Sequence, residues 1–188
     1  MSLRPAAFLD RDGVINVDRG YVVQTEDFEF VSGVFEGAAA LQSLGFALIV
    51  VTNQSGIGRG LYSENDLLAL NCWMIGEFEK RSVHINGVFY CPHHPTDACD
   101  CRKPAPGMLL RAARELNLDL MRSVMFGDRA SDLQAAAAAG VPLRYLLGAD
   151  GLLRPEPDRL SSAQFSNLRE AAASIELREA VSRLAGVQ

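Results

Sequence analysis

The sequence lacks the long apolar runs that membrane-spanning helices need. One of its longest aliphatic runs extends only from Phe46 to Val51, whereas a transmembrane helix needs about 20 apolar residues. The stretch from Met1 to Pro5 also lacks the apolar segment of a signal peptide. We therefore expect a cytoplasmic protein that makes no use of a membrane.

Basic residues are too few to create a strong positive field. The chain has 18 Lys and Arg against 23 Asp and Glu, which gives a net charge of −5. This balance argues against nucleic acid or an anionic membrane as a partner. Hydrophobic residues make up 48% and charged residues 22%, which is typical of a globular protein and not of a disordered one. From 188 residues we expect a single domain spanning 1–188, and a monomer.

Cysteine is also scarce, and its distribution argues against a disulfide scaffold. Three of the four cysteines lie in one window and join a histidine in two i, i+2 pairs, Cys91-x-His93 and Cys99-x-Cys101. Each pair can place both ligands on one side of an extended segment. Three sulfurs and one nitrogen form a closed tetrahedral set for structural Zn²⁺, so residues 91–101 are predicted to form a zinc loop. The alternative is that these four residues are unrelated to one another and bind no metal.

Cys72 and His94 are left outside the predicted metal set. Cys72 is predicted to be a packing residue within a helix. His94 is expected on the loop surface or on the substrate side.

Short apolar runs alternate with helical patterns along the chain. The runs at 6–9, 46–51, 88–90, 124–126 and 141–147 predict buried strands. The patterns at 34–44, 63–80, 106–116, 132–139 and 168–184 predict helices. This alternation predicts an α/β fold with a doubly wound, Rossmann-like parallel sheet. Ligands of such sheets bind beyond the carboxyl ends of the strands.

An acidic pair, Asp10 and Asp12, directly follows the first predicted strand, and Gly13 permits a sharp turn close to a phosphate. Residues i and i+2 of an extended chain point the same way, so both carboxylates can face one site. A cation such as Mg²⁺ would allow both to ionise. One could then attack phosphorus while the other serves as general acid and base. Ordinary turn or cap residues remain the alternative.

Three further groups follow predicted strands or precede a helix. Thr52-Asn53-Gln54-Ser55 can hold phosphate oxygens. Lys103 can neutralise a phosphoryl group, while Arg102 binds a distal part of the substrate. Asp128 can supply another metal carboxylate, and Asp132 either supports it or favours a helix N-terminus. Taken singly, these groups could be an ordinary polar loop, a solvated charge pair and acidic residues near a helix N-terminus. Together they predict phosphoryl-transfer chemistry.

These groups resemble the four motifs of the haloacid dehalogenase superfamily of phosphatases, namely Asp10-Arg11-Asp12-Gly13-Val14, Thr52, Lys103 and Gly127-Asp128 with Asp132. The resemblance implies an aspartyl-phosphate mechanism in which Asp10 is the nucleophile and Asp12 the general acid and base. Thr52 and Lys103 would hold the phosphoryl group. Mg²⁺ would be bound by Asp10, Asp128 and the backbone carbonyl of Asp12. The short spacing of the motifs leaves no room for a large cap domain.

A narrower resemblance, to the heptose-1,7-bisphosphate phosphatases, covers nearly the whole chain. It is carried by Ile15 to Val22, Thr52 to Gly60, Cys91 to Pro95 and Cys101 to Met108. It implies removal of the C7 phosphate of D-glycero-D-manno-heptose 1,7-bisphosphate, in the synthesis of the activated heptose of lipopolysaccharide. The implied substrate contacts are Asp18, Arg19, Gly20, Tyr21, Thr52, Asn53, Gln54, Ser55, Arg102, Lys103 and Arg129.

Three alternatives to this function stay open. Histidinol-phosphate phosphatases share the motifs and the zinc loop, and Asp128 to Asp132 resembles their version, whereas Ser55 and Arg59 favour the heptose enzymes. Nucleic-acid 3′-phosphatases share a similar Thr-Asn-Gln loop, but the net charge argues against that substrate. A non-catalytic binding module organised by zinc would leave the acidic pair without a purpose.

Overall fold

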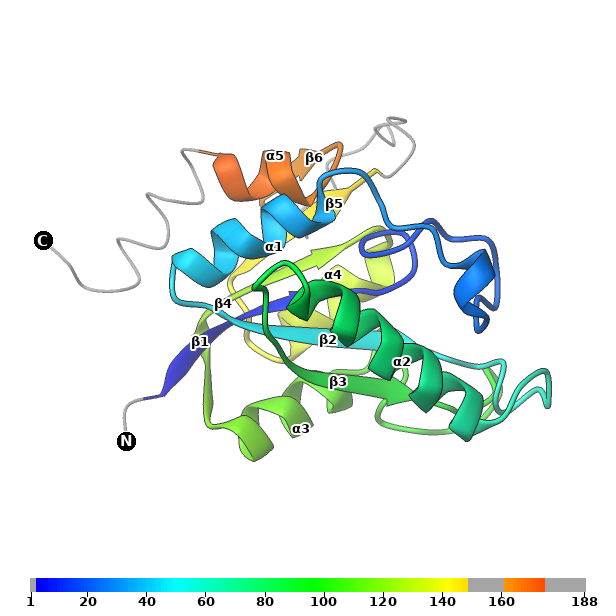
Figure 1. Ribbon diagram of the computed structural model, residues 1–188. Coiled ribbons are helices and arrows are strands. Elements are labelled where there is room, and N and C mark those ends of the chain that lie inside the picture. Colours follow the sequence, from blue (N-terminus) through cyan, green and yellow to red (C-terminus); the bar gives the residue numbers. More distant parts are fainter. Residues whose placement is uncertain (1–2, 149–160, 175–188) are drawn as a thin grey trace, which may run out of the picture.

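A six-stranded parallel sheet forms the centre of the protein in the computed structural model, which describes residues 3–148 and 161–174. Its strands are β1 (Arg4–Leu9), β2 (Ala47–Asn53), β3 (Ile85–Cys91), β4 (Leu118–Gly127), β5 (Leu143–Leu147) and β6 (Ala163–Phe165). The strand order is β3-β2-β1-β4-β5-β6 and every pairing is parallel. The predicted doubly wound fold is therefore confirmed (Figure 1).

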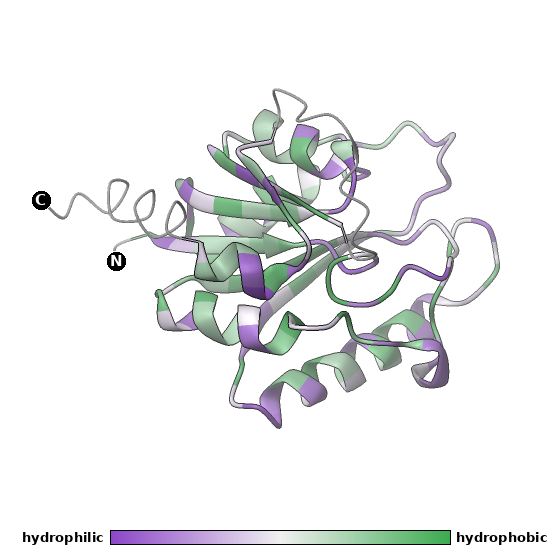
Figure 2. Ribbon diagram, turned by 90° about the horizontal axis from the view of Figure 1, so that it is seen from above, coloured by the Kyte–Doolittle hydropathy of each residue, from purple (hydrophilic) through white to green (hydrophobic). Residues whose placement is uncertain are grey.

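Helices cover both faces of the sheet (Figure 1). They are α1 (Val34–Ser43), α2 (Glu64–Glu79), α3 (Gly107–Leu116), α4 (Ala130–Ala138) and α5 (Leu168–Ala173), with a short 3₁₀ helix η1 (Thr25–Asp27). Apolar residues of α1, α2 and α5 pack on one face, and those of α3 and α4 pack on the other. Because β1 and β2 are covered on both faces, their apolar residues form continuous runs instead of alternating with polar ones (Figure 2).

Local signals account for several element boundaries. Ser63 caps α2: its hydroxyl accepts from Asp66 N–H at 3.2 Å, and the Asp66 carboxylate accepts from Ser63 N–H at 2.8 Å. Gly45 and Gly140 follow α1 and α4 with φ angles of +91° and +85°, a conformation that glycine adopts without steric cost. These glycines end the helices where the sequence predicts.

One strand was missed by the sequence predictions, and one predicted helix can be compared with the structure only in part. The sequence did not predict β6, because its three residues are too few to show a pattern. Of the helix predicted for 168–184, the structure describes α5, which ends at Ala173, and the extended Ser174 that follows it, while residues 175–184 lie outside the described part of the chain.

The prediction for Cys72 was wrong, because this residue is exposed. The buried stripe of α2 consists of Leu67, Leu70, Asn71, Met74 and Phe78, and Cys72 lies on the other side of the helix.

The described residues contain neither a membrane-spanning helix nor a cap domain. Among the described residues, no helix is both long and apolar enough to cross a membrane. The same part of the chain contains no cap-sized insertion between its strands.

Candidate active site

The strand order brings the predicted site residues to one edge of the sheet. β1 lies between β2 and β4, so Leu9 pairs with both Val50 and Phe126. Asp10 continues from β1, and its N–H donates to the carbonyl of Phe126 at 3.0 Å. The site therefore lies where the strand order reverses, which is the usual ligand position in an open α/β sheet.

A cleft of about 520 Å³ opens at this edge. Its lining residues are Asp10, Asp12, Asp18, Gly20, Tyr21, Thr52, Asn53, Gln54, Ser55, Arg59, Tyr62, Pro95, Arg102, Lys103, Arg129, Ser131 and Asp132. Arg19 is the one predicted substrate contact that does not line it, because its guanidinium pairs with Glu29 on the exposed surface.

Four lining residues were not among the predicted contacts: Arg59, Tyr62, Pro95 and Ser131. Arg59 and Pro95 lie within segments that carried the resemblance to the heptose enzymes, and Ser131 lies within the fourth motif, so a sequence signal existed for all three. Tyr62 lies outside these segments and gave no sequence signal.

Lys103 joins two carboxylates at the centre of the cleft. Its Nζ lies 2.7 Å from Asp10 Oδ1 and 2.7 Å from Asp132 Oδ1, and it donates to the carbonyl of Val51 at 2.8 Å. Burial by itself would lower the pKa of Lys103, but Asp10 and Asp132 raise it above its ordinary value. Lys103 is therefore a fixed positive charge at the point where a phosphoryl group could bind.

The two oxygens of Asp10 are in different environments. Oδ1 accepts from Lys103 Nζ at 2.7 Å and from Arg11 N–H at 2.8 Å. Among the described residues, none donates a hydrogen bond to Oδ2. One carboxylate oxygen is thus held in place, while the other remains available to a metal or to an electrophile.

Three carboxyl groups, of Asp10, Asp128 and Asp132, have oxygen atoms within 4.8 Å of one another. Asp128 Oδ1 is buried without a hydrogen-bond partner. Asp132 is already engaged through both oxygens, which accept from Lys103 Nζ and from Arg129 N–H at 3.0 Å. The pKa of Asp10 is raised well above its ordinary value and that of Asp128 is raised to about 6, mainly by burial and in part by the Asp132 carboxylate, although Lys103 acts in the opposite direction on both. A divalent cation with oxygen ligands therefore fits between Asp10 and Asp128.

The approach of the acidic turn to Asp128 requires glycine at position 13. Gly13 has a φ angle of +95°, and a Cβ atom there would lie 2.4 Å from Asp128 Oδ2. A side chain at this position would therefore displace the carboxylate from the proposed cation site.

The carboxylate of Asp12 is held by donors on both oxygens. Oδ1 accepts from Arg11 Nη2 at 2.9 Å and from Asn16 Nδ2 at 3.0 Å, while Oδ2 accepts from Gln54 Nε2 at 2.9 Å. This side chain lies outside the group of three carboxylates, so the carbonyl is the part of Asp12 left for a metal.

Arg11 is a residue for which the sequence suggested no role of its own. It is fully buried, its Nη2 also donates to the carbonyl of Val22 at 2.9 Å, and its guanidinium carbon lies 6.0 Å from the centre of the Phe28 ring. Arg11 thereby ties the acidic turn to the segment that carries Gly20 and Tyr21.

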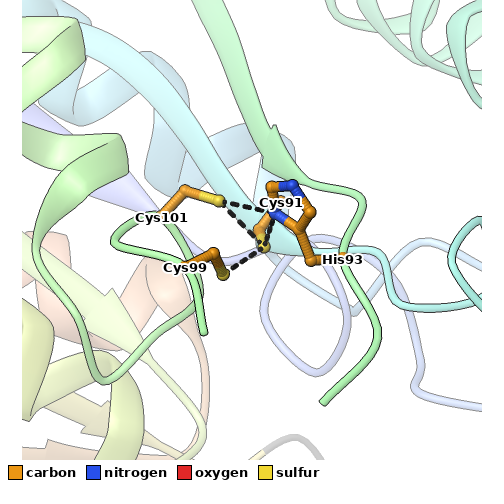
Figure 3. A group of neighbouring side chains, drawn as sticks. All are labelled: Cys91, His93, Cys99 and Cys101. Carbon is orange, nitrogen blue, oxygen red and sulfur yellow. Dashed lines mark hydrogen bonds between the residues drawn. The ribbon is translucent and has the colours of Figure 1, made fainter. Parts of the chain in front are cut away.

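The predicted zinc ligands converge on one point (Figure 3). The ligand atoms of Cys91, His93, Cys99 and Cys101 lie within 4.8 Å of one another. Cys91 Sγ is 3.7 Å from Cys99 Sγ and 3.1 Å from Cys101 Sγ, distances too long for a disulfide. His93 faces the group through Nδ1, 3.1 Å from Cys101 Sγ. Three thiols and an imidazole form a donor set that suits Zn²⁺.

The Cys/His cluster leads directly into the cleft through Arg102 and Lys103. The backbone of Lys103 is held by Asn53, whose Oδ1 accepts from Lys103 N–H at 3.0 Å and whose Nδ2 donates to the Lys103 carbonyl at 3.1 Å. Arg102 lines the cleft and has a buried Nη1 without a partner. His94 does not line it: its ring bonds to Thr96 on the exposed loop.

This chain is similar to known proteins both in sequence and in fold. A family model described as HAD-hydrolase-like matches residues 100–165. A D-glycero-beta-D-manno-heptose-1,7-bisphosphate 7-phosphatase from Vibrio cholerae is 47% identical over 174 residues, covering 89% of this chain and 94% of the relative. The enzyme of the same name from Escherichia coli K12 is 43% identical over 182 residues, covering 93% and 95%.

A solved structure of a heptose bisphosphate phosphatase has a similar fold. The crystal structure of a D,D-heptose 1,7-bisphosphate phosphatase from B. bronchiseptica, complexed with magnesium and phosphate, superposes with a TM-score of 0.79. It is 32% identical, with coverage of 89% of this chain and 96% of that one. The resemblance expected from the sequence is confirmed, and the chain belongs to the D-glycero-beta-D-manno-heptose-1,7-bisphosphate 7-phosphatase family of the haloacid dehalogenase superfamily.

Proposed function

We propose that this chain removes the C7 phosphate of D-glycero-D-manno-heptose 1,7-bisphosphate in the synthesis of lipopolysaccharide heptose. One observation carries the chemistry: Asp10 lies in a polar cleft with one oxygen bonded to Lys103 and the other without a donor among the described residues. The family membership carries the substrate.

In the first step, Asp10 attacks the C7 phosphorus. A carboxylate oxygen forms a bond to phosphorus, and the bond from phosphorus to the sugar oxygen breaks. Asp12 gives a proton to that departing oxygen. Thr52 and Lys103 hold the other phosphoryl oxygens, and the charge of Lys103 offsets the negative charge that gathers there.

In the second step, water releases phosphate from Asp10. Asp12 has lost its proton in the first step and now takes one from the attacking water. The bond between Asp10 and phosphorus breaks, which regenerates the carboxylate. Arg11, Asn16 and Gln54 keep the Asp12 carboxylate in a fixed orientation, and this pre-orientation suits a group that must move a proton twice.

Asp10, Asp128 and the backbone carbonyl of Asp12 would hold Mg²⁺ beside Lys103. When bound, the ion would neutralise carboxylate and phosphoryl charge at the reaction centre. The unpartnered Asp128 oxygen and the raised pKa values of Asp10 and Asp128 support this assignment.

Magnesium is expected to stabilise the protein more at about pH 7.5 than at about pH 5. Without metal, the folded-state pKa of Asp128 is about 6, above its ordinary value of 3.8. The folded protein therefore binds more protons in this window, and its stability falls as the pH rises from 3.8 through about 6. Bound Mg²⁺ would offset this loss of stability only at pH values at which the carboxyl groups are ionised.

Thermal unfolding at both pH values, with and without Mg²⁺, measures the effect. In Asp128→Asn the Mg²⁺-dependent shift in melting temperature is expected to shrink at the higher pH. An equal Mg²⁺ effect at both pH values in the unchanged protein would contradict the cation site.

Zn²⁺ is assigned to Cys91, His93, Cys99 and Cys101 as a structural ion. Because four protein ligands complete a tetrahedron, no position is left for a reacting water. Its purpose would be to hold the loop that presents Arg102 and Lys103 to the substrate. The donor set and the separation of the sulfurs support this assignment.

The distal part of the substrate would meet positive side chains at the rim of the cleft. Arg102 has an unpartnered buried nitrogen, and Arg129 pairs with Asp18, which also lines the cleft. Gly20, Tyr21, Asn53 and Ser55 complete that wall. Lys103 for the reacting phosphate and the arginines Arg102 and Arg129 for the other would suit a substrate with two phosphates.

A side-by-side phosphate-release assay tests the substrate. With Mg²⁺ present, both anomers of heptose 1,7-bisphosphate are compared with histidinol phosphate and with a DNA 3′-phosphate, and we expect one heptose anomer to give the highest kcat/KM. A preference for histidinol phosphate would overturn the substrate and leave the mechanism in place. No phosphate release from any of them would favour a non-catalytic role.

A further inference from the structure

A glutamine amide, that of Gln54, lies between two groups that the proposed mechanism uses. Its Nε2 is 2.9 Å from Asp12 Oδ2 and 2.8 Å from Thr52 Oγ1. Its Oε1 is 2.6 Å from the hydroxyl of Tyr62. The amide thus has a partner for both of its ends.

The directions of these hydrogen bonds follow from chemistry alone. In the ionised form that Asp12 takes after the first step, its carboxylate can only accept, so the atom of Gln54 that faces Asp12 must be the nitrogen. The oxygen then faces Tyr62, whose hydroxyl must donate. Because the same nitrogen donates to Thr52, the Thr52 oxygen accepts, and its own hydrogen is free to point at a phosphoryl oxygen.

Tyr62 is itself held in place. Its ring packs so closely on Gly56 that a Cβ atom there would lie 2.1 Å from a ring carbon. The backbone turn is closed by a hydrogen bond from Leu61 N–H to the Gly56 carbonyl at 2.8 Å. Burial raises the pKa of Tyr62, so the phenol stays protonated and can donate.

We propose that Tyr62 is a positioning residue for the phosphatase reaction, acting through Gln54 on Asp12 and Thr52. Without the tyrosine hydroxyl, nothing else among the described contacts holds Gln54 Oε1, and the amide can rotate away from both groups. The inference rests on the roles proposed for Asp12 and Thr52.

The test is a double-mutant cycle of Tyr62→Phe and Gln54→Ala, assayed with p-nitrophenyl phosphate and with the heptose bisphosphate. Losing one hydrogen bond to an uncharged partner suggests that Tyr62→Phe lowers kcat about tenfold, with KM changed less than about twofold. The loss should be the same for both substrates, since positioning does not depend on the sugar. In the Gln54→Ala background, Tyr62→Phe should have no further effect.

Tyr90→Phe is the matched control. The Tyr90 hydroxyl also bonds to a side chain at 2.6 Å, that of Glu64, but Tyr90 does not line the cleft. Its kcat is expected to stay unchanged. If Gln54→Ala lowers the melting temperature, the cycle is repeated with Gln54→Met, which keeps the length of the side chain without its amide.

Three results would overturn the proposal: an unchanged kcat in Tyr62→Phe, a loss that persists without Gln54, or a loss confined to the heptose substrate. The last would mean that Tyr62 contacts the sugar directly. An error in the proposed substrate would give a different result: the unchanged protein would hydrolyse p-nitrophenyl phosphate and not the heptose bisphosphate. The double-mutant cycle could then still be measured with p-nitrophenyl phosphate.

Discussion

Replacing Asp10 by asparagine is expected to lower phosphate release by about 10⁴-fold or more while the protein stays folded. Asparagine has nearly the same shape, but its amide is a poor nucleophile. The amide oxygen of the variant can still accept from Lys103, which keeps its bonds to Asp132 and Val51. Burial raises the pKa of Asp10, so a neutral group there removes an unfavourable charge.

Phosphate release and thermal unfolding measure the two parts of this expectation. Asp27→Asn is the matched control, because Asp27 is exposed and does not line the cleft. Its activity should equal that of the unchanged protein. Turnover that survives in Asp10→Asn would remove the aspartyl-phosphate mechanism.

Replacing Cys101 by alanine is expected to remove the zinc and much of the activity. The cluster would keep three ligands instead of four, and the segment that follows Cys101 directly is Arg102 and Lys103. A displacement of about 1 Å at such groups costs on the order of 10²-fold in rate. Lys103 retains its contact with Asn53, so the residual activity should not fall to zero.

The Cys101→Ala protein is tested by metal analysis, by its kcat/KM and by its melting temperature. The unchanged protein should hold about one Zn²⁺ per chain, and the Cys101→Ala protein almost none. Cys72→Ala is the matched control, since Cys72 is exposed and outside the cluster. Full activity in a zinc-free protein would contradict the role given to the loop.

Much of the site follows from local sequence because its groups lie at strand ends. Asp10, Thr52 and Asp128 each end a buried apolar run, and parallel strands that share one sheet bring their carboxyl ends to one edge. The zinc pattern is similar, since two i, i+2 pairs on extended segments need little more than a loop closure to converge. Fold class and family could therefore be predicted from the sequence.

The sequence misplaced residues whose surroundings depend on distant segments. Cys72 belongs to an apolar-looking stretch, but the sheet covers only the other side of α2. Arg19 belongs to a segment that lines the cleft, yet it pairs with Glu29 at the surface. Side-chain direction within a segment is set by what packs against it, and neighbours along the chain do not carry that information.

The sheet, the motifs and the predicted metal ligands all follow from the sequence alone, because periodicity and spacing act over a few residues. Which charged side chains pair with one another depends on the tertiary structure alone. Lys103 bonds to Asp10, 93 residues away along the chain, and to Asp132, which leaves an Asp128 oxygen buried and free for a cation. The tertiary structure also decided that Tyr62 reaches Gln54, and Gln54 reaches Asp12 across 42 residues. Such contacts depend on strand order and register, which place distant residues within hydrogen-bond distance only when the whole sheet has formed.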